Sequence, residues 1–411
     1  MTPTADEAAF LARVCEQPDD DGPRLIYADF LDEFGDPRGA FIRVQCALAK
    51  LEPGDARRIT LEEDEKGYLA QYREAWNPLR GLAGWVEWRR GFVEVVNIEA
   101  RLFLMRGAEL FHLAPVRHVR LLDVAGLLKP VLASPHLGRV AELSVKNQHF
   151  DDELARRLAD APQLANLRAL CVERNRISDR GVEALAHSPH LSNLKALDLG
   201  DNHAGDLGAC RLADSPRLAT LETLELRHNE IGFGGLEVLA SSGRLERLSV
   251  LGLRRNEIGH ADRRYLTGAG SGRLGLRRLD LRENGMTPDH LESLCDLLSA
   301  TSVEDLDLSE NRLGDEGVRQ LATSACLDGV RSLALRRNAV SDAGVRALAQ
   351  SPHLARLTRL DLAENAIHNP GAELLLGSQA LAGLRHLSLS RAGLSMRIRR
   401  ALHARFGTRM I

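Results

Sequence analysis

Asparagine is the residue type whose spacing most clearly points to shared chemistry. It follows pairs of leucines in stretches such as LDLSENRLGD (306–315) and LDLAENAIHN (360–369). Successive asparagines are 27 residues apart, except for one interval of 28 that contains the glycine-rich TGAGSG (267–272). An amide is both donor and acceptor, so it can satisfy backbone groups that a buried turn leaves unpaired. We expect a structural column, with a row of ligand-binding amides as the alternative. The column consists of Asn175, Asn202, Asn229, Asn256, Asn284, Asn311, Asn338 and Asn365.

Charged residues recur with the same period and could recognise a partner. The site between the two leucines is often acidic, as at Asp198 and Glu225, and the two sites after the second leucine are often basic. Arginine can bind a carboxylate through two parallel hydrogen bonds. Opposite charges on neighbouring strands can also neutralise each other, so a self-neutralising sheet is the alternative. We predict a partner-binding surface that consists of Arg227, Arg254, Arg255, Arg282, Arg336, Arg337, Asp280, Asp307 and Asp361, with Arg391 as a further basic site.

Two adjacent arginine pairs stand out within this set, Arg254/Arg255 and Arg336/Arg337. The central outward site of the preceding strand is uncharged in both cases, because Gly252 and Ala334 occupy it. We therefore predict that these arginines lack an acid on their own strand and are available to acidic groups of a partner.

The chain lacks the motifs that carry common enzymatic chemistry. It contains no nucleophile elbow, phosphate-binding loop, zincin helix or EF-hand, and its 14 histidines form no ligand-spaced pair. The adjacent Asp19, Asp20 and Asp21 are typical of a solvated turn rather than of a metal site. The six cysteines are widely spaced without a CxxC motif, which favours reduced thiols over a disulfide framework. We predict a non-enzymatic protein without a cofactor.

Each repeat must supply a strand and a helix to position these side chains. The L-x-L segment alternates with the period of a strand, with leucines inward and charged sites outward. In SDAGVRALAQS (341–351), Val345, Leu348 and Ala349 share one helical face, and Ser341 or Asp342 is placed to cap the helix. One such unit cannot bury its leucines alone, but stacked units share a core. Strands stack ~4.8 Å apart and helices need about 8–10 Å, so the stack should bend into an open horseshoe.

The repeats resemble the ribonuclease-inhibitor-like class of leucine-rich repeats, on the L-x-x-L-x-L-x-x-N-x-L pattern and the helix in each unit. This resemblance implies an α/β solenoid over 91–394, with about ten to twelve repeats, a parallel sheet on the concave face and helices on the convex face. It also implies recognition of a partner protein through the concave face. The leucine-rich-repeat activators of the Ran-type GTPase are similar, which makes regulation of a small GTPase the alternative function.

The two ends of the chain depart from the repeat. Residues 1–90 predict short helices over about 5–15, 23–34, 38–51 and 59–76, and the stretch PDDDGPRLIYADFLDEFGDPRGAFIRVQ resembles a small bacterial repeat-companion domain. We expect this helical module to cover one apolar end of the solenoid. Residues 395–411 predict a capping helix at the other end, with a basic amphipathic tail as the alternative.

The composition of the chain limits the kinds of partner and the cellular compartment that we expect. The 411 residues carry a formal net charge of −3 and only 4% aromatic residues, which disfavours nucleic-acid binding. Residues near the N-terminus are acidic, and no apolar run approaches the ~18 residues that a membrane span needs. We expect a cytoplasmic monomer that binds protein and neither nucleic acid nor membrane.

Overall fold

The computed structural model describes residues 5–52, 54–124, 126–260, 275–390, 393–407 and 409–410. Arg391 and the glycine-rich 267–272 lie outside these residues. The chain divides into two compact units. The first comprises the chain up to Gln148 with Ala161–Val172, and the second comprises His149–Asp160 with the chain from Glu173 onward.

The first unit begins with four helices, as the sequence predicts. They are α1 (Ala5–Glu16), α2 (Gly22–Glu33), α3 (Arg38–Lys50) and α4 (Arg57–Trp76). Pro23 lies in the first turn of α2, where its fixed φ suits a helix start. Tyr27, Leu31 and Ile42 pack with Phe92 in one buried cluster. Helices α2 and α3 therefore share a core with β2 (Phe92–Glu99).

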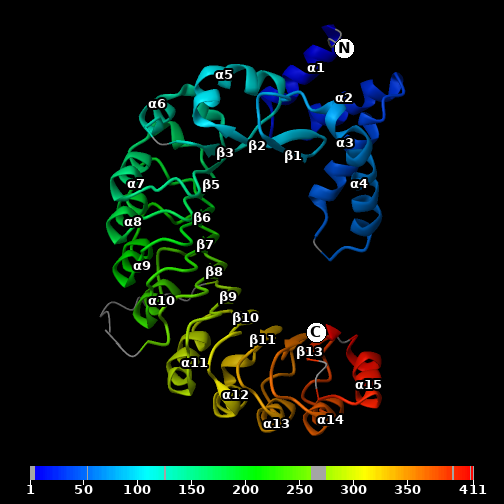
Figure 1. The fold of residues 1–411 in the computed structure, drawn as a ribbon, viewed down its shortest axis with the longest axis vertical. Coiled ribbons are helices and arrows are strands. Elements are labelled where there is room, and N and C mark those ends of the chain that lie inside the picture. The colour runs from blue at the N-terminus through cyan, green and yellow to red at the C-terminus, as the bar shows by residue number, and fades with distance from the viewer. Residues whose placement is uncertain are drawn as a thin grey trace. The chain divides into compact units, whose positions relative to one another are not determined.

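A short sheet and its covering helices complete the first unit (Figure 1). The strands are β1 (Trp85–Arg89), β2 (Phe92–Glu99), β3 (His118–Leu122), β4 (Glu142–Ser144) and β5 (Ala169–Cys171), and the helices are α5 (Ala100–Leu113), α6 (Leu128–Ala133), η1 (Pro135–Arg139) and η2 (Pro162–Leu164). Strand β1 pairs antiparallel with β2, whereas β2 to β5 pair in parallel. The strand β1 departs from the expectation of a purely helical segment up to residue 90. Gly91, at φ 85°, permits the tight reversal that makes the hairpin.

An ion pair buried in the first unit fixes the helices to β2. The Arg24 side chain is fully buried, and its Nη2 lies 2.8 Å from Oε1 of Glu94. The same guanidinium donates to the carbonyl oxygens of Pro18 and Arg90. Burial lowers the pKa of Arg24 and raises that of Glu94, while the charge of each partner opposes the shift. Glu94 also pairs with Arg90 at 3.0 Å. The Arg24–Glu94 pair is sequestered from water, so removal of Glu94 leaves the buried charge of Arg24 without a carboxylate partner.

The second unit repeats one strand and one helix per turn (Figure 1). Its strands lie on the inner, concave side of the stack, and its helices lie on the outer, convex side. The strands are β6 (Ala196–Asp198), β7 (Thr223–Glu225), β8 (Val250–Gly252), β9 (Arg278–Asp280), β10 (Asp305–Asp307), β11 (Ser332–Ala334), β12 (Arg359–Asp361), β13 (His386–Leu389) and β14 (Arg409–Met410). The helices are α7 (Asp152–Ala159), α8 (Asp179–Ala186), α9 (Asp206–Ala213), α10 (Phe233–Ala240), η3 (Pro288–His290), α11 (Leu291–Ser299), α12 (Gly314–Thr323), η4 (Ala325–Leu327), α13 (Asp342–Gln350), α14 (Asn369–Gly377) and α15 (Met396–Phe406).

Neighbouring strands of this unit are parallel and in register from leucine to leucine. Leu306 of β10 lies opposite Leu279 of β9 and Leu333 of β11. Each of these leucines is almost fully buried, whereas the flanking strand residues are partly exposed. The predicted parallel sheet with covering helices is therefore confirmed. The C-terminal segment differs in detail, because Gly407 in the left-handed region ends α15 and the chain returns to pair β14 with β13.

The asparagines connect each turn to the turn before it. The Oδ1 atom of Asn311 accepts hydrogen bonds from the backbone N–H groups of Asn284 (3.1 Å) and Met286 (3.0 Å). Its Nδ2 atom donates to the carbonyl oxygens of Leu281 (3.0 Å) in the preceding repeat and Leu308 (2.9 Å) in its own. Oδ1 likewise accepts from the preceding repeat at Asn175, Asn202, Asn229, Asn256, Asn284, Asn338 and Asn365.

The residue before each asparagine adopts a left-handed backbone conformation. Its φ angle lies between 51° and 59°, as at Arg255 and Glu310. Non-glycine residues enter this region at a cost of roughly 1–2 kcal/mol, and the asparagine side chain provides the hydrogen bonds that hold it. The remaining members of the series are Arg174, Asp201, His228, Glu283, Arg337 and Glu364.

A second series of side chains links the helices of successive repeats. Oδ1 of Asp315 accepts from the N–H groups of Ser341 (2.7 Å) and Gly344 (3.0 Å), so an aspartate of one repeat caps the helix of the next. A Cβ atom at Gly344 would lie 2.6 Å from that oxygen, which explains the glycine. Asp152, Asp179 and Asp206 accept the corresponding pairs of N–H groups.

Candidate partner-binding surface

The charged side chains of the concave sheet pair mainly across neighbouring repeats. We define the concave surface by the outward residues of β6 to β12 and the two residues that follow the buried leucine after each strand. Arg227 contacts three carboxylates, with 2.8 Å to Glu173, 3.5 Å to Asp198 and 3.9 Å to Asp201. Its position is therefore fixed by the sheet itself.

Arg282 forms the second cluster of the surface. Its Nε donates to Oδ1 of Asp280 at 2.9 Å, Nη2 donates to Oδ2 of the same residue at 2.5 Å, and Nε lies 3.3 Å from Asp307. The hydrogen bonds to Asp280 raise the pKa of Arg282. Burial raises the pKa of Asp307, although the charge of Arg282 opposes that shift. Three predicted site residues are thus brought together.

The two arginine pairs lack an acid on their own strand, but the prediction that they are available to a partner is wrong for three of the four arginines. Arg254 donates from Nε to Glu283 at 2.6 Å. Arg336 and Arg337 both pair with Glu364, and Arg337 also lies 3.4 Å from Glu310. The acids come from neighbouring repeats, which are only ~4.8 Å away, well within the reach of an arginine.

Two predicted residues have no ion pair to another described side chain. Arg255 is exposed and occupies the left-handed position before Asn256. Asp361 is partly buried, and its Oδ1 accepts from the N–H of Ala363 at 2.9 Å. Of the candidate arginines that the structure describes, Arg255 is therefore the one whose charge is most available to a partner.

A hollow of ≈ 330 Å³ opens in the concave surface at Gly252. A Cβ atom on Gly252 would lie 1.9 Å from Oε2 of Glu225, so the Glu225 carboxylate occupies the space above the glycine. Four carboxylates and two guanidiniums line the hollow, which leaves a formal charge of −2. We call it the acidic hollow; its charged residues are Glu225, Asp280, Asp305, Asp307, Arg278 and Arg282.

Glu225 differs from the other acids of the acidic hollow. Asp305 pairs with Arg278 at 2.9 Å, and Asp280 and Asp307 face Arg282. The Glu225 carboxylate makes no hydrogen bond or ion pair with another described residue. Its burial raises the pKa of Glu225, and the charge of nearby Asp198 raises it further. A cationic group that entered the hollow would relieve this unfavourable environment.

The sequence contained a signal for this hollow. Gly252 interrupts the row of acidic central sites, and glycine inside a strand often marks a close approach of another group. From the sequence, we inferred that the absence of a side chain at Gly252 leaves Arg254 without an acidic partner on its own strand. The structure shows that the vacant space is used by Glu225, which the predicted site did not include.

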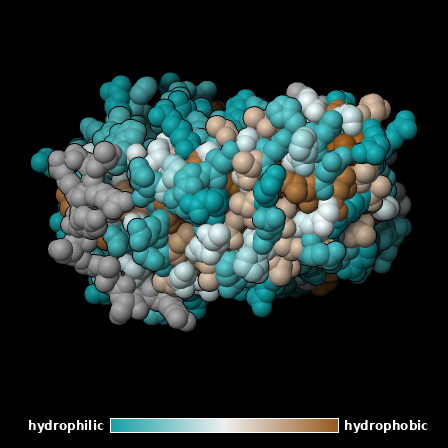
Figure 2. All heavy atoms as spheres, turned by 90° about the horizontal axis from the view of Figure 1, so that it is seen from below, coloured by the Kyte–Doolittle hydropathy of each residue, from teal (hydrophilic) through white to brown (hydrophobic). Residues whose placement is uncertain are grey.

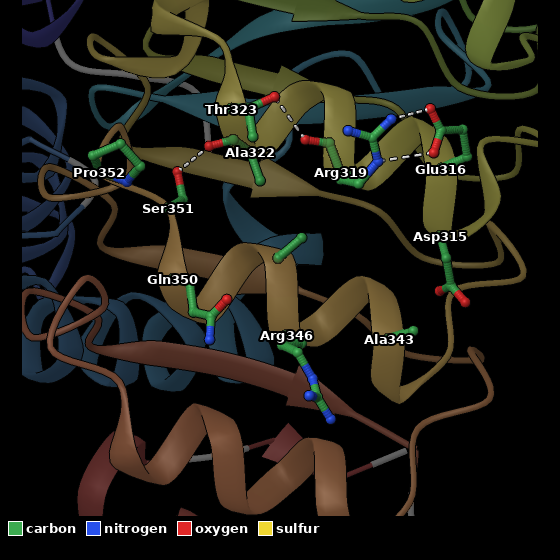
Figure 3. A pocket seen from close by; sticks show the side chains of 11 residues that line it. Asp315, Glu316, Arg319, Ala322, Thr323, Ala343, Arg346, Gln350, Ser351 and Pro352 are labelled. Carbon is green, nitrogen blue, oxygen red and sulfur yellow. Dashed lines mark hydrogen bonds and ion pairs between the residues drawn. The ribbon is translucent and has the colours of Figure 1, made fainter.

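A second hollow lies on the convex side between α12 and α13 (Figure 3). Its volume is ≈ 470 Å³. Asp315 caps the next helix, and Arg319 pairs with Glu316 at 2.5 Å. Ser351 donates from Oγ to the carbonyl oxygen of Ala322. These polar groups bind one another between neighbouring repeats, so the convex hollow is a weaker candidate for a binding site than the acidic hollow.

Viewed from below, the helical face of this unit carries hydrophilic side chains interspersed with apolar ones (Figure 2).

No helix in the described ranges is both long and apolar enough to span a membrane.

Comparison with known proteins relates the chain to repeat proteins. The family model described as Leucine Rich repeat matches residues 163–186, 190–213, 217–240, 299–322, 330–349 and 353–376. Among curated proteins, no sequence matches the chain.

Two solved structures are similar to this one. The Rad7 and Elc1 complex from yeast contains a chain with 15% sequence identity and a TM-score of 0.50, over 100% of this chain and 98% of that chain. An internalin from Listeria monocytogenes has 17% identity and a TM-score of 0.39, over 70% of this chain and 90% of that chain. At 15% identity, the likeness to the yeast chain concerns the fold. The repeat matches and the parallel strands with covering helices give the chain the fold of a leucine-rich-repeat solenoid.

Proposed function

We propose that the protein is a non-enzymatic scaffold that binds a partner protein on its concave surface, with a lysine or arginine of the partner in the acidic hollow. The observation that carries this proposal is the unpaired carboxylate of Glu225 above Gly252. A cationic side chain would gain two or more carboxylate contacts there without displacing a guanidinium from its present partner. The leucine-rich repeats support a role in protein–protein interaction.

The remainder of the concave surface suits a partner of mixed charge. Arg255 can receive an acidic group, because it is exposed and no described side chain neutralises it. Gly252 and Arg255 are three residues apart in one repeat, so both lie within an ordinary interface of ~800 Å² per partner. Most other charges are already paired and contribute mainly to specificity rather than to affinity.

Crosslinking of the full-length chain in the native cell tests where the partner binds. A photoreactive amino acid at Val250, beside Gly252, is expected to capture a partner, whereas the same residue at Arg346 on the convex side should not. Affinity measured with the captured partner then tests the hollow. Glu225→Gln should weaken binding by about tenfold or more, and Glu316→Gln on the convex side should leave it unchanged.

A second comparison tests the exposed arginine. Arg255→Glu reverses a charge without breaking a salt bridge of the sheet, and glutamate already occupies this left-handed position in other repeats. Arg346→Glu is the matched control, because Arg346 is an exposed arginine on the convex helix α13. A partner whose affinity responds to Arg346→Glu but ignores Glu225→Gln and Arg255→Glu would refute the concave site.

Regulation of a small GTPase is the alternative function. It rests on the resemblance of the repeats, and no particular residue supports it. A GTP-hydrolysis assay with small GTPases of the same genome separates the two functions: acceleration by the full-length chain would favour the alternative.

A further inference from the structure

Two cysteines of adjacent repeats in the second unit lie in direct contact. Sγ of Cys295 on α11 is 2.7 Å from Sγ of Cys326 in η4. A disulfide bond requires an S–S separation of roughly 2.05 Å. The two sulfur atoms therefore need to approach each other by less than about 1 Å for the bond to form. The two residues are 31 positions apart in the sequence. Their contact therefore results from the stacking of repeats and not from a local motif.

The surroundings give the two sulfur atoms different roles. Cys295 is partly exposed, whereas Cys326 is only 8% exposed. The hydrogen bond between the two thiols lowers the pKa of Cys295 and raises that of Cys326. Since the thiolate is the reactive form, Cys295 is the sulfur that an oxidant in solution reaches and that reacts first.

Three other described cysteines, Cys15, Cys46 and Cys210, lack this combination. Cys15 and Cys46 are buried, and burial raises the pKa of each to about 11. Cys210 is partly exposed on α9, but its burial there raises its pKa, and no described cysteine contacts it. The Cys295–Cys326 contact thus combines exposure, an activated sulfur and a second thiol within reach.

We propose that Cys295 and Cys326 form a reversible dithiol–disulfide pair that is oxidised by hydrogen peroxide and that ties one repeat to the next. The Cys295 thiolate attacks one peroxide oxygen, the O–O bond breaks, and hydroxide leaves while Cys295 becomes a sulfenic acid. The Cys326 sulfur then attacks the Cys295 sulfur. The S–S bond forms, the S–O bond breaks, and the oxygen leaves as water together with the Cys326 proton.

The overall step transfers two electrons from the two sulfur atoms to the peroxide oxygens. Hydroxide and the proton released from Cys295 combine as water, so one peroxide and two thiols give one disulfide and two waters. A dithiol reductant reverses the reaction by thiol–disulfide exchange. The bond links α11 to the turn before β11 and encloses β10 and α12. It therefore constrains the unfolded chain across a complete repeat.

Mass spectrometry of the full-length protein tests this pair directly. Trypsin cleaves after Arg312 and Arg319, which lie between the two cysteines, so the disulfide joins two separate peptides. After treatment with hydrogen peroxide and alkylation, we expect a linked peptide pair that is about 2 Da lighter than the sum of its reduced parts. Dithiothreitol should return both cysteines to the alkylated form.

Thermal unfolding gives an independent readout of the cross-link. Oxidation should raise the Tm by on the order of 5 °C, because a closed loop of this length restricts the unfolded state. Cys295→Ser and Cys326→Ser should each abolish the shift, whereas Cys210→Ser should retain it. If peroxide leaves both thiols open to alkylation, or oxidises Cys295 to the sulfinic acid without a linked peptide, the proposal is wrong. The peptide analysis uses the wild-type chain, so it decides the matter even if a serine variant does not fold.

Discussion

The asparagine column allows a quantitative test of what stabilises the solenoid. Replacement of Asn311 by alanine removes two bonds that its Oδ1 accepts and two that its Nδ2 donates to leucine carbonyls. Asn311 is only 5% exposed, so water cannot readily take its place. An orphaned buried group costs about 1–3 kcal/mol. With the N–H groups of Asn284 and Met286 both unpaired, we expect a loss of roughly 2–5 kcal/mol in unfolding free energy.

Urea unfolding followed by circular dichroism measures this loss. Repeat arrays can unfold in parts, so the m-value must be compared between variants before free energies are compared. Asn166→Ala is the matched control, because Asn166 is exposed and donates a single hydrogen bond to Gly138. That control should change stability by less than about 0.5 kcal/mol.

Hydrogen exchange locates the effect within the chain. In the Asn311→Ala variant, the amides of Asn284 and Met286 should exchange faster, while the amides of distant repeats keep their protection. If the variant unfolds at the urea concentration of the parent, and these two amides remain protected, the column does not stabilise the turns as we reason.

Three further outcomes follow from the structure. Removal of residues 395–411 should promote aggregation, detectable by light scattering, because Leu402 and its neighbours no longer cover the last repeat; an unchanged monomer would exclude the capping role. Glu94→Ala should reduce the unfolding free energy by about 3–5 kcal/mol, since Arg24 is left charged and fully buried without a carboxylate partner; Glu16→Ala, at an exposed position of α1, is its control in urea unfolding. Glu225→Gln should raise stability at pH 7: burial raises the folded pKa of Glu225, so the unfolded carboxyl loses its proton first and stability falls as pH rises toward the folded pKa. A stability–pH profile that the substitution leaves unchanged would contradict this.

The periodic parts of the fold could be predicted, and the unique contacts could not. Apolar residues equivalent to Leu306 and Val345 recur at fixed intervals in the other repeats. The strand, the helix and their buried faces therefore follow from the spacing alone. β1 belongs to no repeat, and its pairing with β2 depends on a single reversal at Gly91. The position of α15 was predictable from its apolar stripe, whereas the return of the chain to β13 was not.

The sequence predicted which charged residues lie on the candidate surface, but not which of them form ion pairs with one another. The outward sites were found because they alternate with leucine. Whether Arg254 is free depends on whether Glu283 of the next repeat reaches it, which is a matter of side-chain geometry across the sheet. The same holds for Arg24 with Glu94 and for Cys295 with Cys326, whose partners are distant in sequence and follow no period.

The asparagines and the helix-capping aspartates connect neighbouring repeats in opposite directions along the chain. This difference affects how a repeat is completed while the chain is being synthesised. Asp315 caps the helix of the following repeat, so in a chain made from its N-terminus each new helix meets a cap that already exists. Asn311 instead completes the turn of the preceding repeat, which stays unfinished until the next 27 residues have been added. A nascent array therefore ends in a helix that is already capped and a turn that is still open, and each added repeat closes the one before it.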